Sequence, residues 1–190
     1  ASDVYKRQSR DCITLVKYKD RDVLPITPER YKRIMIVHVK GAESGMGMLM
    51  KAMGMGGGKN PAEMLKERLC EKGFDAFIYE SPLDAMKKQI AAGEKPNINL
   101  YFAGKNAIDD FVSSMDLVIT LCDVSSGRPS FGLSKGGGEI PWYVFELPVV
   151  VIGCGQPTML ADVPQARTYI NTYDAKPATF DALVDDLMAG

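Results

Sequence analysis

Three glycines, a carboxylate and the only tryptophan of the chain lie together in the stretch SKGGGEIPWYVFE, residues 134–146. The glycines at 136–138 can adopt positive φ and let the backbone approach another surface closely. Pro141 suits the first turn of a helix, so Glu139 and Trp142 would lie near a helix N-terminus, where backbone N–H groups can bind an anion or a carbonyl oxygen. We expect a close-approach loop at a domain boundary. A structural role stays open, in which Glu139 interacts with the helix dipole and Trp142 fills a core.

A second glycine-rich stretch, GAESGMGMLMKAMGMGGGKN at residues 41–60, lacks the nucleotide-binding motifs. The phosphate-binding loop GxxxxGK[ST] needs a hydroxyl after its lysine, but Gly58 and Lys59 are followed by Asn60. The residue five places before Gly58 is Met53 instead of glycine, and the dinucleotide pattern GxGxxG fails as well. We therefore expect a mobile loop whose flexible methionines pack on a neighbouring surface, and we expect no cofactor.

The residue types that serve in hydrolysis are sparse. His38 is the only histidine and falls inside an apolar run, which favours a hydrogen-bonded imidazole in the core. No GxSxG elbow accompanies it, so a serine hydrolase triad is not indicated. Asp116 and Asp123 bracket one expected strand, and at about 3.3 Å per residue they lie too far apart to act on one bond. We expect Asp116 to be a helix-to-strand cap and Asp123 to be a loop carboxylate.

Composition narrows the class of protein. The 190 residues carry a formal net charge of −1, which gives no field to attract nucleic acid or acidic membranes, and 46% hydrophobic residues suit a single globular domain. The four cysteines form no CxxC pair, so neither a metal site nor a disulfide framework is indicated, and we expect a cytoplasmic location. No apolar run reaches the ~18 residues of a membrane helix.

Strands and helices alternate along the chain. Apolar and β-branched runs predict an extended segment followed by five strands, at 12–27, 33–39, 75–79, 116–122, 148–154 and 168–173. Helix-start residues and periodic apolar positions predict helices at about 60–73, 81–93, 106–115 and 177–188. In the second helix, Leu83, Met86 and Ile90 are expected to face inward. The alternation predicts an α/β sandwich, with a mostly parallel doubly wound sheet and helices on both faces.

The chain is expected to hold one domain behind a short leading segment. The opening residues ASDVYKRQ look like translated cloning or adaptor sequence, with an ordinary polar tail as the alternative. We divide the chain into a cloning-derived tail at 1–8, a linker and entry segment at 9–32 and an α/β sandwich domain at 33–190.

Three stretches of the sequence resemble the C-terminal domain of family 3 glycoside hydrolases, in the bacterial β-N-acetylhexosaminidase branch. They are DCITLVKYKDRDVLPITPERYKRIMIV (11–37), SGRPSFGLSKGGGEIPWYVFELPVVVIGCGQPTMLADVP (126–164) and ARTYINTYDAKPATFDALVDDLMAG (166–190). The resemblance implies an α/β sandwich packed against a (β/α)8 barrel, in an enzyme that removes terminal β-linked N-acetylglucosamine. In that branch the barrel carries the nucleophilic aspartate and the histidine and aspartate of the acid-base pair. This chain is therefore expected to hold no catalytic residue and to be inactive alone.

The resemblance leaves this domain to pack on the barrel of the same full-length protein and to line one side of the sugar pocket. Arg128 and Glu139 would hold polar groups of the sugar or brace a barrel loop, while Trp142 would supply an apolar wall. Phe131 keeps the ring area of the family's aromatic residue but lacks its indole N–H donor. The candidate substrate-binding or interface residues are Arg128, Gly136, Gly137, Gly138, Glu139 and Trp142. The alternative is a freestanding α/β module that binds a small ligand at its strand ends.

Overall fold

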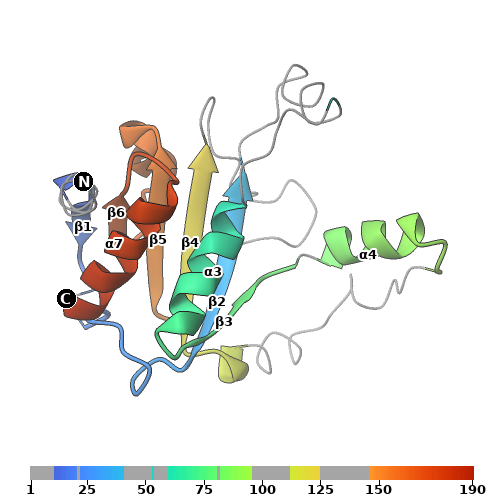
Figure 1. Ribbon diagram of the computed structural model, residues 1–190, viewed down its shortest axis with the longest axis horizontal. Coiled ribbons are helices and arrows are strands. Elements are labelled where there is room, and N and C mark those ends of the chain that lie inside the picture. The colour runs from blue at the N-terminus through green and yellow to red at the C-terminus, as the bar shows by residue number, and fades with distance from the viewer. Residues whose placement is uncertain are drawn as a thin grey trace.

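The computed structural model describes residues 11–20, 22–40, 53, 60–80, 82–95, 112–124 and 146–190. Within these ranges a six-stranded sheet forms the centre of the fold, in the order β1-β6-β5-β4-β2-β3 (Figure 1). The strands are β1 (Thr14–Tyr18), β2 (Arg33–Lys40), β3 (Asp75–Ile78), β4 (Leu117–Val124), β5 (Val149–Gly155) and β6 (Thr168–Asn171). Neighbouring strands pair in parallel except β1, which is antiparallel to β6. The predicted α/β fold with a mostly parallel sheet is confirmed.

Helices α3 (Pro61–Glu71) and α7 (Pro177–Ala189) cover the same face of the sheet, the near face in Figure 1. Both begin with the proline that the sequence places at the first turn. The side-chain oxygen of Asn60 accepts a hydrogen bond from the N–H of Ala62 at 3.1 Å and so caps α3. Gly73, with φ of 93°, follows the end of α3, because glycine adopts this left-handed conformation without a Cβ clash.

The sheet separates two apolar clusters. On the face of α3 and α7, the strand side chains pack against Leu65, Leu69, Phe180 and Leu183. On the opposite face, the cluster around Tyr169 includes Met159 of the 3-10 helix η2 (Pro157–Asp162). Full burial of a side chain of leucine or phenylalanine size contributes about 1.5–3 kcal/mol, so burial on both faces fixes the strands in register.

The helix α4 (Pro82–Ala91) departs from one sequence prediction. Its apolar spacing predicts that Ile90 faces inward, but this side chain is 56% exposed. Figure 1 shows α4 beyond β3, to the side of the sheet and away from α3 and α7. The prediction is wrong because apolar spacing identifies residues that share a helix face, whereas burial also requires a surface opposite that face.

The segment before β2 contributes to the same sheet and core. Thr14 of β1 lies opposite Asn171, and Tyr18 lies opposite Thr168. Ile26 is fully buried, and its N–H donates to the carbonyl oxygen of Leu187 in α7 at 2.9 Å. Part of the linker and entry segment predicted at 9–32 therefore forms the edge strand β1, and Val23 and Ile26 belong to the hydrophobic core.

Strand β4 is longer than its apolar run predicts. It continues through Val124, so Asp123 lies within the strand and not in a loop. Of the helix predicted at 106–115, the structure describes residues 112–115, and 112–114 are helical. The rest of that predicted helix lies outside the described residues.

Asp116 joins the amino ends of two strands. Its Oδ2 accepts the backbone N–H of Arg33 at 2.8 Å, and its Oδ1 accepts the guanidinium Nη2–H at 2.9 Å. The backbone N–H of Asp116 donates in return to the carbonyl oxygen of Arg33 at 3.0 Å. The side-chain hydrogen bond from Arg33 holds the pKa of Asp116 below its ordinary value, although burial opposes this effect.

We expect the Asp116→Asn variant to lose less stability in acid than the unchanged chain loses. Because the folded pKa is depressed, the carboxylate stabilises the fold above the unfolded pKa of about 4, and this contribution is lost as the pH falls through the folded pKa. The variant should lower the free energy of unfolding by about 1 kcal/mol at pH 7 and by less at pH 3, after allowance for solvent screening.

The measurement is urea unfolding followed by circular dichroism between pH 2.5 and 7. Asp75→Asn is the matched control, because Asp75 begins the adjacent strand and its side chain is 67% exposed. This control should show the pH dependence of the unchanged chain. An Asp116→Asn variant with the same acid dependence as the unchanged chain would contradict the role assigned to this carboxylate.

Candidate functional site at the carboxyl edge of the sheet

The order of the strands marks one position at the carboxyl edge of the sheet. From β2 the chain passes through α3 to β3 on one side, and β4 then lies on the other side of β2. The connections therefore reverse direction between β2 and β4. In open α/β sheets, ligands bind outside the carboxyl ends of the strands at such a topological switch point.

Two side chains that could do chemistry lie at this position. His38 is near the end of β2 and Asp123 near the end of β4, and the register pairs Lys40 with Asp123. The imidazole Nε2 of His38 lies 3.6 Å from Oδ2 of Asp123. The His38 side chain is 7% exposed and that of Asp123 is 32% exposed, so the carboxylate faces solvent while the imidazole lies behind it.

The environment of His38 matches the sequence prediction in its burial and differs from it at one ring nitrogen. The sequence favours a hydrogen-bonded core imidazole, and the side chain is buried as expected. Its Nε2, however, is buried without a hydrogen-bond partner among the described residues, because 3.6 Å to Asp123 exceeds the range of a normal hydrogen bond. The sequence predicts that His38 and Asp123 each lie near the end of a strand. Only the order of the strands in the sheet shows that the two residues lie side by side.

The thiols next to this pair are unsuited to nucleophilic attack. Cys154 lies beside Asp123 in the register of β5 and β4, and the hydroxyl of Thr172 lies 3.2 Å from its Sγ. Burial raises the pKa of Cys154 to about 12, although the hydrogen bond with Thr172 opposes this. Burial also raises the pKa of Cys122. Because the thiolate is the reactive form, both cysteines act as small core residues at neutral pH.

The opposite face of the sheet is tightly filled at Gly153. A Cβ at this position would come within clashing distance of the hydroxyl oxygen of Tyr169, and would lie 2.9 Å from Oδ1 of Asn171. Both oxygen atoms are buried without a hydrogen-bond partner in the described structure. Burial raises the pKa of Tyr169. The Tyr169 ring therefore takes the space that glycine leaves free, and this packing fixes the end of β5.

The residues that the sequence singles out lie outside the described structure. Arg128, Gly136, Gly137, Gly138, Glu139 and Trp142 all fall in residues 125–145, between the end of β4 and Glu146. Met53 is the only described residue of the methionine-rich stretch 44–59. The structure therefore tests neither set, and the roles assigned to the six candidates stay predictions.

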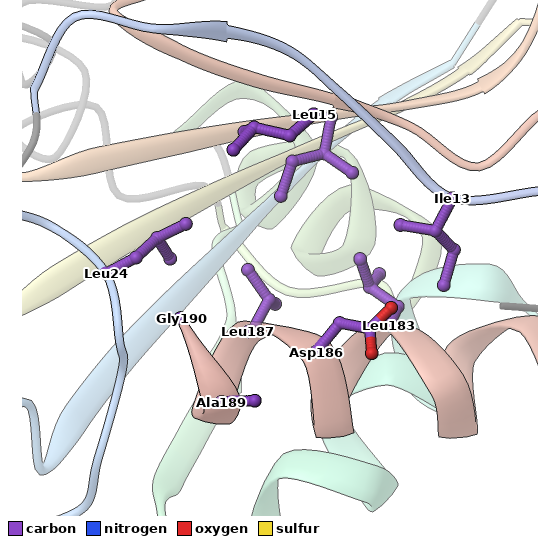
Figure 2. A pocket seen from close by; sticks show the side chains of 9 residues that line it. Ile13, Leu15, Leu24, Leu183, Asp186, Leu187, Ala189 and Gly190 are labelled. Carbon is purple, nitrogen blue, oxygen red and sulfur yellow. The ribbon is translucent and has the colours of Figure 1, made fainter. Parts of the chain in front are cut away.

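A pocket of about 260 Å³ lies away from the switch point, between β1 and α7. Figure 2 shows Ile13, Leu15 and Leu24 facing Leu183 and Leu187 of α7 across this space. Asp186 is the one charged side chain among the residues that line it. Its walls are apolar, so the pocket is suited to hold an apolar group and offers little to catalysis.

The described residues show neither a metal site nor a membrane-spanning helix. Among them, no group of three or more His, Cys, Asp or Glu side chains is placed to hold a metal ion. Across the same ranges, no helix has both the length and the apolar character needed to cross a membrane.

Known proteins resemble nearly the whole chain, although no family model matches it. A protein of Cellulomonas fimi described as "Beta-N-acetylglucosaminidase/beta-glucosidase" is 28% identical over 176 residues, which are 90% of this chain and 27% of that protein. The structure of "Beta-glucoside phosphorylase BglX" has a TM-score of 0.64 at 25% identity, over 96% of this chain and 28% of that one. The chain is related to the C-terminal domain of family 3 glycoside hydrolases.

The chain also shares its fold with a more distant structure. The glycoside hydrolase family 3 beta-N-acetylglucosaminidase from Paenibacillus sp. str. FPU-7 has a TM-score of 0.60 at 14% identity, over 97% of this chain and 29% of that one. The domain thus spans little more than a quarter of the length of each of these relatives. The resemblance to the C-terminal domain of family 3 glycoside hydrolases, inferred from three stretches of the sequence, is confirmed, whereas the N-acetylhexosaminidase branch stays a prediction, because the relatives include a β-glucoside phosphorylase.

Proposed function

We propose that this family 3 domain is the non-catalytic part of a glycoside hydrolase that removes terminal β-linked N-acetylglucosamine. In this proposal it packs on a (β/α)8 barrel of the same protein, which carries the catalytic residues. The observation that carries the proposal is the 28% identity over 176 residues to a protein whose name gives β-N-acetylglucosaminidase and β-glucosidase activities. The match covers 27% of that protein, which leaves most of its length for a further domain.

Two features of the activity need separate support. The acetamido sugar is proposed over glucose because three stretches of the sequence, including residues 126–164, resemble the N-acetylhexosaminidase branch. Water is proposed as the acceptor because the Cellulomonas relative is named as a glycosidase, whereas BglX is named as a phosphorylase. An assay with and without inorganic phosphate distinguishes these acceptors.

The segment that leaves the switch point is proposed to shape the sugar pocket. Residues 125–145 follow the end of β4, which carries Asp123. In this proposal Arg128 and Glu139 hold polar groups of the sugar or brace a barrel loop, and Trp142 forms an apolar wall. Removing a hydrogen bond made by a charged side chain costs a factor of about ten in affinity, so these roles are measurable.

We expect this chain alone to release no nitrophenol from p-nitrophenyl β-N-acetylglucosaminide, and the chain joined to the barrel of its own reading frame to hydrolyse it. In the joined protein, Arg128→Ala should raise KM by about ten-fold. Arg30→Ala is the matched control: Arg30 stacks on Tyr31 with its guanidinium carbon 4.9 Å from the ring centroid, and Tyr31 lies before β2 at the amino edge. Turnover by the isolated chain, or release that requires phosphate, would contradict the proposal.

A further inference from the structure

The His38–Asp123 pair is costly to the fold as it stands. A buried polar atom without a hydrogen-bond partner loses its hydration and gains nothing in return. Within the part of the chain that the structure describes, His38 Nε2 is such an atom, and its side chain is more than nine-tenths buried. An apolar residue at this position of β2 would avoid that cost, so the imidazole is explained better by a role at the edge of the sheet than by packing.

The position of the pair points to ligand binding. His38 and Asp123 lie on the two strands that flank the topological switch point, at the end of the sheet where open α/β folds bind ligands. The Asp123 side chain is 32% exposed, so one side of the carboxylate is open to solvent and the other faces the imidazole. In this arrangement the Asp123 carboxylate can accept hydrogen bonds from a ligand on its exposed side, while the His38 imidazole fixes its position on the buried side.

We propose that the carboxyl edge of the sheet between β2 and β4 binds a neutral sugar, with Asp123 accepting hydrogen bonds from its hydroxyl groups and His38 as the positioning residue of that carboxylate. With a proton on Nε2, the imidazole donates to Asp123 once a small movement shortens the 3.6 Å separation. The choice of a sugar as the ligand rests on the proposed function. The site itself rests on the two residues and on the order of the strands.

The chemistry of the pair disfavours the other common ligands. A carboxylate repels phosphate and other anions. A structural zinc ion needs four protein ligands, and the described residues bring together no group of even three His, Cys, Asp or Glu side chains. A carboxylate accepts hydrogen bonds from adjacent hydroxyl groups with no charge repulsion and with no need for further protein ligands.

Because His38 is the only histidine, its ring signals can be read without assignment of the remaining spectrum. Long-range ¹H–¹⁵N spectra of the 190-residue chain would be recorded during separate titrations with N-acetylglucosamine, glucose, inorganic phosphate and magnesium chloride. We expect saturable shifts of the ring signals with the two sugars only, at millimolar concentrations. No saturable shift with either sugar overturns the site, and a saturable shift with phosphate or magnesium alone overturns the ligand class.

Substitutions separate binding from packing. Asp123→Asn should raise the Kd for N-acetylglucosamine by at least about ten-fold, while Asp116→Asn, at the opposite end of the same strand, should leave it unchanged. For the His38 variants, binding is measured by saturation transfer to the sugar. His38→Leu should weaken binding by about ten-fold without loss of stability, and His38→Gln, which keeps a donor, should restore most of it. A His38→Leu variant that binds normally would leave the imidazole with a structural role only.

The outcomes of this experiment and of the glycosidase assay are distinguishable. Sugar binding by the chain, combined with a joined protein that does not hydrolyse the glycoside, would overturn the proposed function and keep the site. Hydrolysis by the joined protein, combined with an unresponsive His38 ring, would overturn the site and keep the function.

Discussion

Gly153→Ala should lower the free energy of unfolding by about 3 kcal/mol, at the upper end of the cost of overpacking a core. The added methyl group would clash with the Tyr169 hydroxyl oxygen and would lie 2.9 Å from Asn171 Oδ1. The Tyr169 ring is fully buried on β6, so it cannot move aside without disturbing the packing around it. The expected result is a lower urea midpoint with an unchanged slope of the transition.

A second substitution tests whether this cost comes from crowding. Tyr169→Phe alone should change stability little, because the hydroxyl that it removes is buried without a partner in the described structure. Combined with Gly153→Ala, it should recover part of the loss, since the clash with the hydroxyl disappears while the 2.9 Å contact with Asn171 remains.

Gly93→Ala is the control for backbone conformation. Gly93 has φ of +75° and no neighbour within 4 Å of an added Cβ, so its substitution should cost only about 1 kcal/mol of backbone strain. Equal losses for the two alanine variants, or no recovery in the double variant, would refute the steric account of Gly153.

The second large effect is expected from truncation before β2. A chain that begins at residue 33 loses β1 and the buried side chains of Val23, Ile26 and Tyr31. At about 1.5–3 kcal/mol for each buried side chain, this loss approaches the 5–15 kcal/mol that stabilise a whole domain. We expect this shorter chain to lack a cooperative thermal transition in circular dichroism.

Removal of residues 1–8 alone is the matched truncation. The sequence assigns these residues to a cloning-derived tail, which would take no part in the fold. The chain that begins at residue 9 should therefore unfold at the same temperature as the unchanged chain. A cooperative transition in the chain from residue 33 would show that β1 and its core residues are dispensable, and would restore the boundary drawn from the sequence.

Local patterns were sufficient to predict most of the strands and helices. The apolar runs at 33–39, 116–122 and 148–154 are typical of strands covered on both faces, and each matches a strand of the sheet to within two residues at either end. Asn60 and Gly73 mark the ends of α3 because capping and left-handed glycine are effects of single residues. These features depend on neighbours in the sequence, so the sequence reveals them.

The features that local patterns missed depend on distant parts of the chain. The exposure of Ile90 depends on where α4 lies, and the pairing of β1 with β6 joins the two ends of the sequence. The contact between His38 and Asp123 requires β4 to lie beside β2, which neither strand's residues specify. A histidine and an aspartate near the ends of two predicted strands were the available signal, because parallel strands end at the same edge.

The antiparallel direction of β1 decides where an upstream domain would be tethered. Thr14 lies opposite Asn171 at the end of β6, so the chain reaches β1 at the same edge as His38 and Asp123. Three strands separate β1 from the switch point, a distance of about 17 Å at the usual spacing between strands. A domain attached before β1 would therefore join the chain at this edge of the sheet, and its contact with the edge would form within one molecule rather than between two.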